Sequence, residues 1–355
     1  KDKLPPPIGN GKSGFTSINS THTGVTAANQ IGEKEVLENQ HLMHGSGVAL
    51  GDANGDGLID IYIARIRENN VLYLNKGNWQ FEDVSEAAGV SCSSRYSTGA
   101  VFADVDGDRD LDLIVTALGG PNSLFINKGD GTFNESRLAS NLDNPGSTSS
   151  ALADVDNDGD LDLYITNYKR LAIRDSLPPP ILSFENTLIE LTNNRWIVRP
   201  PFNQHYETEV RNNILLRFEM AEVDQFYLNN GNGKFELVNI TKNYFTDENG
   251  QPLKTHLRDW GLMAQFRDLN NDSHPDIYIC NDFESPDRIW INNGDGTFRA
   301  LPKLAIRHTS NSSMAVDFSD LNNDGDFDIF VTDMMSQSHI LQKTQMGTMA
   351  PTPLS

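Results

Sequence analysis

The stretch GAVFADVDGDRDLDLIVT, residues 99–116, places an acidic loop between two apolar runs. The loop follows the pattern D-x-D/N-x-D-x-x-x-D, and four further copies begin at Asp52, Asp154, Asp268 and Asp320. The residues after the five loops are IYIA, LIVT, LYIT, IYIC and IFVT, which are β-branched or aromatic runs and predict strands, not helices. Five loops in one register therefore indicate a repeat protein built from strands.

A second signature follows each of the first four loops. It reads LYLNKGNWQF from Leu72, LFINKGDGTF from Leu124, FYLNNGNGKF from Phe226 and IWINNGDGTF from Ile289. Asn and Gly between two apolar runs predict a β-hairpin. A short strand, the acidic loop, a second strand and the hairpin give four strands in roughly 50 residues, which is the content of a propeller blade. The predicted fold class is therefore all-β, a β-propeller of four-stranded blades.

The repeat spacing locates an insertion in the third blade. From loop start to hairpin Asn the chain runs 23 residues in the first two repeats, but 75 from Asp154 to Asn229. We therefore predict an inserted irregular and helical segment at residues 168–224, whose prolines suggest an excursion over one face. The repeats then lie near 46–97, 98–148, 149–259, 260–311 and 312–355, after a tail at residues 1–13.

The two ends of the repeat region differ from its middle. GFTSINSTHTGV from Gly14 is similar to QFEDVSEAAGV from Gln80, so the N-terminal segment is expected to supply an outer strand of a blade. The fifth repeat has no N-x-G-x-G-x-F hairpin before Ser355. The propeller of residues 14–355 is therefore expected to represent about five blades and to stop within the last one.

Each acidic loop is a candidate cation site. Calcium takes about six to eight oxygen ligands with flexible geometry, whereas magnesium demands stricter geometry, and the strand after each loop excludes an EF-hand. Two carboxylates about 4 Å apart repel by roughly 4 kcal/mol at an effective dielectric constant near 20, so solvated turns explain five crowded loops poorly. The predicted Ca²⁺ ligands, from loop positions 1, 3, 5, 7 and 9, are Asp52, Asn54, Asp56, Leu58 and Asp60; Asp104, Asp106, Asp108, Asp110 and Asp112; Asp154, Asp156, Asp158, Asp160 and Asp162; Asp268, Asn270, Asp272, His274 and Asp276; and Asp320, Asn322, Asp324, Asp326 and Asp328.

The five sites are not expected to be equal. The second and third loops carry four carboxylates, whereas Asn replaces one of them in the other three. Position 6 is glycine in three loops but Arg109 and Ser273 in the other two, where a left-handed backbone would be strained. The fourth loop also carries Pro275, so the site at Asp268 is predicted to be the weakest and the site at Asp154 the firmest.

Composition excludes several classes of protein. The net charge is −21, and five bound Ca²⁺ would bring it to −11, so metal sites account for much of the acidity. No stripe of Lys and Arg suggests binding to nucleic acid. No apolar run approaches a membrane span. Cys92 and Cys280 are too few for a disulfide framework, and KDKLPPPIG is not a signal peptide.

These motifs carry a family resemblance. GAVFADVDGDRDLDLIVT and its siblings resemble FG-GAP/VCBS repeats, the calcium-binding blades of integrin α-subunit propellers. NDFESPDRIWINNGDGTF from Asn281 and TDMMSQSHILQKTQM from Thr332 are similar to bacterial members of the cartilage acidic protein group, which often carry an ASPIC/UnbV domain. The resemblance implies a seven-bladed propeller with calcium at the matching Asp and Asn positions. The chain departs from the family in showing five loops and no ASPIC/UnbV segment.

Candidate sites beyond calcium are fewer. The insertion mixes aromatic and hydrogen-bonding side chains, which form either a ligand-binding surface or a small satellite core. His41 and His44 form an H-x-x-H pattern without an evident third ligand, and Asp282, Glu284 and Asp287 are either paired catalytic carboxylates or supports of a loop. The candidate ligand-binding residues are Arg195, Trp196, Arg199, Phe202, His205 and Tyr206.

The sequence therefore predicts a calcium-binding, secreted propeller in an extracellular, periplasmic or cell-surface location. It would act in adhesion or as a scaffold that binds a protein or a carbohydrate ligand. The alternative is the propeller domain of a polysaccharide-active enzyme, a lyase or hydrolase, since the fold alone does not decide function. Loss of turnover on changing Asp287 or His205 would favour that alternative.

Overall fold

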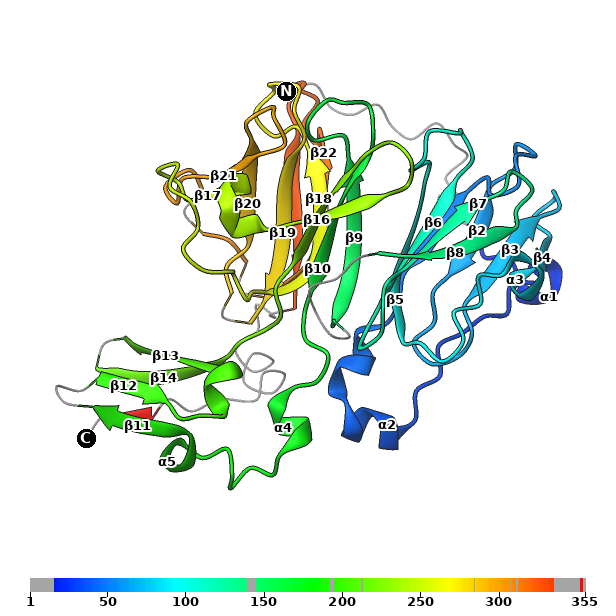
Figure 1. Cartoon of the computed structure of the whole chain (residues 1–355). Coiled ribbons are helices and arrows are strands. Elements are labelled where there is room, and N and C mark those ends of the chain that lie inside the picture. The colour runs from blue at the N-terminus through cyan, green and yellow to red at the C-terminus, as the bar shows by residue number, and fades with distance from the viewer. Residues whose placement is uncertain are drawn as a thin grey trace.

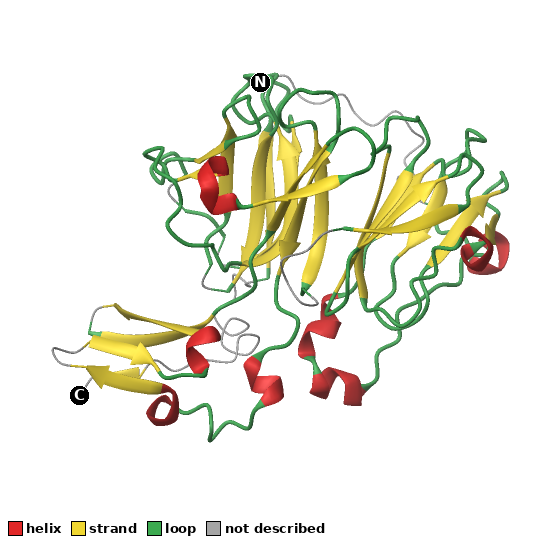
Figure 2. Cartoon of the chain, in the orientation of Figure 1, coloured by secondary structure: helices red, strands yellow, loops and turns green. Residues whose placement is uncertain are grey.

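The computed structural model describes residues 16–138, 145–191, 195–211, 213–283, 285–306, 308–310, 312–334 and 352–353, and these residues form mostly strands with a few short helices (Figures 1 and 2). The predicted tail at residues 1–13 lies outside these ranges. Three sheets have four antiparallel strands, and a fourth adds one parallel strand. The prediction of an all-β fold with four-stranded blades is confirmed.

The sheets are named blades A to E in chain order. Blade A holds β1 (Val48–Gly51), β2 (Asp60–Ile63), β3 (Val71–Asn75) and β4 (Phe81–Asp83); blade B holds β5 (Ser97–Ala103), β6 (Asp112–Ala117), β7 (Ser123–Asn127) and β8 (Phe133–Arg137); blade C holds β9 (Ser147–Ala153), β10 (Asp162–Asn167), β15 (Gln225–Asn229) and β16 (Phe235–Val238); blade D holds β18 (Trp260–Arg267), β19 (Asp276–Asp282), β20 (Arg288–Asn292), β21 (Phe298–Ala300) and the parallel β17 (Phe245–Thr246); blade E holds β22 (Ser313–Ser319) and β23 (Asp328–Asp333).

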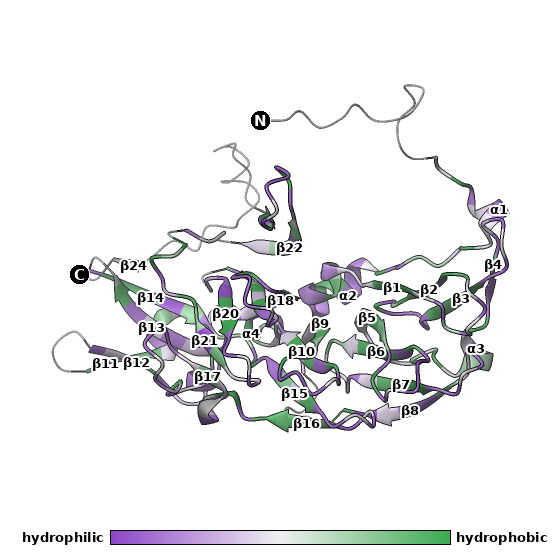
Figure 3. Cartoon of the chain, turned by 90° about the horizontal axis from the view of Figure 1, so that it is seen from above, coloured by the Kyte–Doolittle hydropathy of each residue, from purple (hydrophilic) through white to green (hydrophobic). Residues whose placement is uncertain are grey.

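The blades follow one another in an arc, with β1 and β22 at its two ends (Figure 3). Their first strands, β1, β5, β9, β18 and β22, contact each other in that order. The acidic loops join the first and second strands, so they all lie at one end of the sheets. The hydrophobic core lies between blades: Tyr62 and Leu72 of blade A, for example, pack against Leu113 and Phe125 of blade B.

In blades B, C and D the hairpin Asn ties the blade to the one before it. Asn127 Nδ2 donates to Leu111 O in its own blade and to Ala53 O in the acidic loop of blade A, both at 2.9 Å. Asn229 and Asn292 repeat the bond to the preceding loop, at Val105 O and Val155 O, both at 2.8 Å. These bonds satisfy buried carbonyl groups across every interface from A to D.

The second glycine of the N-x-G-x-G hairpin lies close against the acidic loop of the preceding blade. Gly131 of blade B has φ +76° and lies against the acidic loop of blade A, where an added Cβ would be 3.1 Å from Asn54 Cβ. Gly296 of blade D meets Asp156 Cβ of blade C at the same 3.1 Å. A side chain at either position would push a hairpin off the neighbouring loop.

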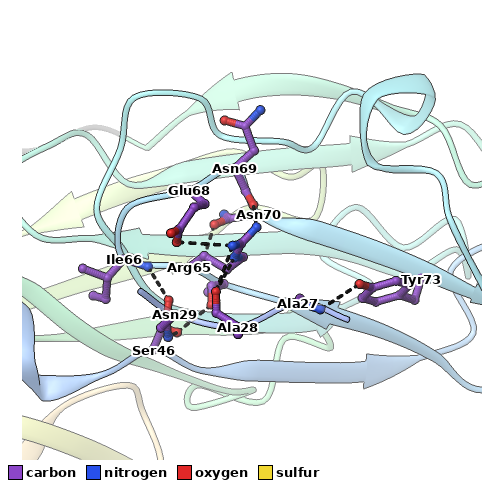
Figure 4. A network of polar contacts seen from close by, with 11 residues as sticks. Ala27, Ala28, Asn29, Ser46, Arg65, Ile66, Glu68, Asn69, Asn70 and Tyr73 are labelled. Atoms are coloured by element: carbon purple, nitrogen blue, oxygen red, sulfur yellow. Dashed lines mark hydrogen bonds and ion pairs between the residues drawn. The ribbon is translucent and has the colours of Figure 1, made fainter. Parts of the chain in front are cut away.

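The segment before blade A is different from the prediction. No strand forms at residues 16–19, and the similarity to residues 80–90 corresponds instead to two short helices, α1 (Ser20–Thr23) and α3 (Ser85–Ala88), each ended by a left-handed glycine. Residues 26–29 then run along blade A, where Tyr73 Oη accepts from two backbone N–H groups and Arg65 donates to Ala28 O (Figure 4). Hydrogen bonds to side chains replace strand pairing at this edge.

Residues between β10 and β15 form a separate lobe set apart from the blades (Figure 1). Besides short helical turns the lobe contains two hairpins, which the sequence reading did not anticipate. Short helical segments also lie before blade A and between blades C and D. The remaining elements are α2 (Glu33–Glu38), η1 (Gln40–His44), α4 (Ile173–Ser176), α5 (Phe184–Thr187), β11 (Leu188–Leu191), β12 (Arg195–Val198), η2 (Phe202–Gln204), β13 (Tyr206–Arg211), β14 (Ile214–Glu219), η3 (Ile240–Tyr244) and β24 (Thr352–Pro353), which pairs with β14.

The Asn tie yields a matched prediction. Asn127 bonds two blades, whereas Asn75 of blade A, among the described residues, bonds only Ile59 O of its own blade through the same atom. We expect Asn127→Ala to lower the free energy of unfolding by about 1–3 kcal/mol more than Asn75→Ala. Only Asn127→Ala leaves a carbonyl at a blade interface without its hydrogen-bond donor. Urea unfolding of both variants measures the difference, and equal losses would contradict the tie.

Candidate functional site

The acidic loops share one hydrogen-bond pattern. The carboxylate at position 1 accepts from backbone N–H groups at the far side of the turn: Asp154 Oδ1 from Asp158 and Asp154 Oδ2 from Gly159, both at 3.1 Å. The carboxylate at position 5 accepts from the N–H at position 7, as Asp158 does from Asp160 at 3.0 Å. The chain therefore curls around the side chains at positions 1 and 5.

Two loops bring three carboxylates especially close. Asp104, Asp106 and Asp108 in one loop, and Asp154, Asp156 and Asp162 in the next, each place one oxygen per residue within 4.8 Å of the others. They belong to the two loops that carry four carboxylates. Burial, and then repulsion by Asp158, raises the pKa of Asp156. An all-oxygen set of this charge suits a hard divalent cation.

The Asp at position 9 has a structural role that the sequence reading missed. Asp162 is 1% exposed; its Oδ2 accepts from Val155 N at 3.1 Å and its Oδ1 from Asn229 N at 2.9 Å. The carboxylates of Asp60, Asp112 and Asp276 accept the same pair of bonds, from position 2 of the loop and from the hairpin Asn. This residue fastens loop to hairpin, and each oxygen keeps a lone pair for a cation.

Burial makes these position 9 carboxyl groups weaker acids. It raises the pKa of Asp162 to about 7 and that of Asp112 and Asp276 to about 6, against the lowering effect of the two backbone N–H bonds. Nearby carboxylates of the same loop add to the rise. A cation beside such a group would favour its charged form.

The residues at position 6 adopt the backbone that glycine adopts elsewhere. Arg109 has φ +79° and Ser273 φ +73°, beside +85° for Gly57 and +96° for Gly159. Both non-glycine residues thus keep the loop shape at the cost of an unfavourable left-handed conformation. In the loop at Asp268, His274 Nδ1 lies 3.0 Å from Asn157 Nδ2, so this loop also contacts the preceding one.

Some of the candidate ligand-binding residues belong to the core of the lobe, and others lie on or near its surface. Tyr206, 7% exposed, packs with Ile173 and Leu182, and Phe202 joins that cluster. His205 is half-buried, and Arg199 Nε donates to Leu188 O at 2.8 Å. Arg195 is exposed on β12, and the half-buried Trp196 has an indole N–H with no partner among the described residues.

Asp287 occupies a repeated structural position at the other end of the sheets. Its Oδ1 accepts from Asn281 N, and its Oδ2 from Tyr278 Oη and Ser313 Oγ. In blades A and B the same backbone bond is made by Asn70 and Asn122. Asp287 therefore caps the end of the second strand of blade D, as these Asn residues do in blades A and B. Glu284 lies outside the described residues.

The H-x-x-H histidines contact the base of the lobe. The ring of His41, 3% exposed, lies with Nδ1 2.7 Å from Lys169 O, and burial lowers the pKa of His41. The rings of His41 and His44 stack at 5.4 Å, and both meet Tyr168 edge-on. Within the described ranges, neither histidine belongs to a group of three metal-ligating side chains as close as those in the loops.

Comparison with known proteins assigns the repeats. Residues 52–115, 104–165 and 268–331 each match the FG-GAP-like repeat, and together they span half of the chain. The chain belongs to the FG-GAP-like repeat family. This FG-GAP-like repeat protein is also 31% identical over 118 residues to cartilage acidic protein 1 of Homo sapiens, covering 29% of this chain and 17% of that protein. The Xenopus tropicalis protein of the same name is 29% identical over 82 residues, covering 23% and 13%.

Solved structures give weaker likenesses. An Agrocybe aegerita lectin described as recognising non-reducing terminal N-acetylglucosamine aligns with TM-score 0.27 and 18% identity, over 70% of this chain and 63% of that one. The V. cholerae biofilm matrix protein Bap1 aligns with TM-score 0.32 and 16% identity, over 78% and 41%. At these scores the likenesses add nothing to the assignment. In the part of the chain that the structure describes, no helix has the length and apolar character of a membrane span.

The cap position of blade C allows a test of buried charge. Asp224 accepts from Asn167 N and Tyr164 Oη, and burial raises its pKa to about 7. The stability that its protonated form contributes is complete below the unfolded pKa of about 4 and is lost as pH rises through 7. Asn at this position keeps both bonds, as Asn70 does with Tyr62. We expect the melting temperature of Asp224→Asn, relative to the parent, to rise between pH 5 and pH 8.

Melting curves of parent and Asp224→Asn across this pH range provide the measurement. Carboxylates elsewhere titrate in both proteins, so they cancel in the difference. A difference that stays constant from pH 5 to pH 8 would show that Asp224 does not carry the pH dependence.

Proposed function

We propose that this protein is a calcium-binding propeller that acts outside the cell or at its surface as a scaffold for binding a protein or a glycan. The observation that carries the calcium proposal is the convergence of Asp104, Asp106 and Asp108, and of Asp154, Asp156 and Asp162, within 4.8 Å. Five loops of one pattern extend the proposal to five sites, with the ligands at positions 1, 3, 5, 7 and 9.

The carboxylate oxygens of the loops suit calcium in their chemistry and in their arrangement. Three carboxylates within 4.8 Å repel strongly, and their backbone hydrogen bonds hold them inward instead of splayed into water. A bound Ca²⁺ would supply the positive charge that offsets this repulsion. Asp162 can join as a ligand while it holds Val155 and Asn229, so ion binding and blade assembly would act through one residue.

Calcium would then contribute a large part of the stability. Extracellular calcium modules have dissociation constants of about 10⁻⁴ to 10⁻³ M. Calcium at ten times the dissociation constant stabilises a site by roughly 1.4 kcal/mol. Five independent sites would give about 7 kcal/mol, which is comparable to the typical net stability of about 5–15 kcal/mol. An extracellular, periplasmic or surface location is proposed because millimolar calcium fills such sites.

Chelation is the first test. We expect EDTA to lower the melting temperature by many degrees and added CaCl₂ to restore it, because the carboxylates then repel without a counter-charge. Calorimetric titration of the calcium-free protein measures the number of ions bound. An unchanged melting temperature together with no heat of binding would refute the calcium proposal.

Matched variants place the ion within the loops. Saturating calcium should stabilise Asp156→Asn by about 1.4 kcal/mol less than it stabilises the parent, since one site is weakened. Asp130→Asn removes the same charge from an exposed hairpin residue whose carboxylate bonds only Thr132 in the described structure. The second variant should respond to calcium as the parent does, and equal losses in both would point to a general charge effect.

The ligand surface is proposed on β12 of the lobe. Arg195 is exposed and precedes the half-buried Trp196, and a charged group beside an aromatic side chain suits a glycan or peptide. Tyr206 is instead part of the lobe core and lies under Arg217, whose guanidinium is 4.3 Å from its ring centroid. The proposed binding residues are therefore separate from the cluster around Tyr206.

Variants of the lobe separate the two roles. We expect Arg195→Ala, at an exposed position, to keep the parent melting temperature and to weaken binding on arrays of defined glycans and matrix peptides. Tyr206→Ala should lower the melting temperature, because it leaves a cavity beside Ile173 and Leu182. If the parent binds a probe and Arg195→Ala binds it equally well, the ligand surface lies elsewhere.

A further inference from the structure

The position 9 carboxylates of neighbouring acidic loops are joined by a continuous series of hydrogen bonds. The loops take the letters of their blades, A to E. In loop C, Asp162 Oδ2 accepts from Val155 N at 3.1 Å, and Val155 O accepts from Asn292 Nδ2 at 2.8 Å. Asn292 N then donates to Asp276 Oδ1 of loop D at 2.8 Å. Three hydrogen bonds thus connect the position 9 carboxylate of one loop to that of the next.

The same three bonds recur between blades A and B and between blades B and C, with lengths of 2.8 to 3.0 Å. They run from Asp60 through Ala53 and Asn127 to Asp112, and from Asp112 through Val105 and Asn229 to Asp162. The four carboxylates in the series are at most 1% exposed, so water does not compete for these bonds. A buried hydrogen-bonded path therefore links the loops of blades A to D.

The hairpin that carries each Asn also lies against a predicted ion ligand of the preceding loop. An added Cβ on Gly296 would lie 3.1 Å from Asp156 Cβ, and one on Gly233 would lie 3.5 Å from Asp106 Cβ. Both aspartates are at position 3 of their loops. The hairpin of one blade therefore contacts the preceding loop at its position 2 carbonyl and at its position 3 side chain.

We propose that adjacent acidic loops bind calcium cooperatively, and that the coupling passes through the hairpin Asn. The inference rests on the proposed calcium sites and adds an interaction between them. When loop C is ordered around an ion, Asp162 holds Val155 in place. Val155 O then fixes the side chain of Asn292, whose backbone N–H orients Asp276 of loop D.

Positive coupling follows from the conformational freedom that a loop loses when it binds an ion. This loss opposes binding. If the preceding loop is already ordered, the hairpin Asn and the position 9 Asp of the next loop are held before its own ion binds, so less freedom remains to be lost. The coupling joins nearest neighbours, as expected for a chain built of stacked repeats.

Electrostatics acts in the opposite direction and can be separated from this coupling. An ion in loop C reduces the negative charge that attracts a second ion to loop D. Salt screens exposed charges beyond about 8 Å at physiological ionic strength, whereas the residues that join Asp162 to Asp276 are buried. We therefore expect added NaCl not to weaken the coupling.

Hydrogen exchange measured by mass spectrometry tests the coupling on the full chain, because it reads each loop separately. Calcium is titrated, and the concentration that gives half-maximal protection, the calcium midpoint, is recorded for peptides from loops A and D. Asp158→Asn removes one carboxylate from loop C. Loop C is predicted to fill before loop D, so we expect this variant to raise the calcium midpoint of loop D by roughly fivefold, the lower end of typical coupling between sites.

Three comparisons separate coupling from a general charge effect. Asp130→Asn removes the same charge from an exposed hairpin residue of blade B and should leave the calcium midpoint of loop D unchanged. In Asp158→Asn, the midpoint of loop A should rise less than that of loop D, because blade B lies between loops A and C. Asn292→Ala removes the donor to Val155 O, so adding Asp158→Asn to it should shift loop D much less than in the parent.

The outcomes distinguish the coupling from the calcium sites themselves. Equal calcium midpoints of loop D in the parent and in Asp158→Asn would overturn the coupling and leave the calcium sites standing. A shift of full size in the Asn292→Ala background, or an equal shift in Asp130→Asn, would also overturn it, because the hairpin Asn would not carry the effect. Absence of calcium-dependent protection in every loop of the parent would refute the calcium proposal and the coupling with it.

Discussion

The hydrogen bond from each hairpin Asn to the acidic loop of the preceding blade is the constraint on which the arc depends. Asn127, Asn229 and Asn292 each reach a carbonyl that their own blade cannot satisfy. The same three residues give their backbone N–H to the Asp at position 9 of their own loop. In each of blades B, C and D, one residue thus fixes the hairpin to its own loop and to the loop of the preceding blade.

This arrangement makes the acidic loops part of the blade interface as well as candidate ion sites. Val155 O, which accepts from Asn292, belongs to the acidic loop that begins at Asp154. Repulsion between the carboxylates of that loop would therefore also strain the bond between blades. Offset of that repulsion by calcium, as proposed, would therefore stabilise the interface between blades and not the loop alone. The lobe between β10 and β15 leaves these bonds intact, because Asn229 follows the lobe and still reaches Val105 O.

Much of the fold could be predicted from the sequence, because the loop and hairpin motifs are local and repeat in register. The double role of Asp162 could not, since its burial and its bond to Asn229 depend on a partner 67 residues away. The hairpins of the lobe were missed because that stretch has no N-x-G turn. Phe202 and Tyr206 could be read from sequence as surface or core, and only their packing with Ile173 and Leu182 decided between the two.

The central claim is that the carboxylates of the acidic loops converge to hold calcium. A crystal structure grown in millimolar CaCl₂, with anomalous scattering data, tests it most directly. The account predicts anomalous peaks about 2.3–2.6 Å from the oxygens of Asp104, Asp106 and Asp108 and of Asp154, Asp156 and Asp162. Carboxylates turned outward, with no anomalous peak in either loop, would contradict it.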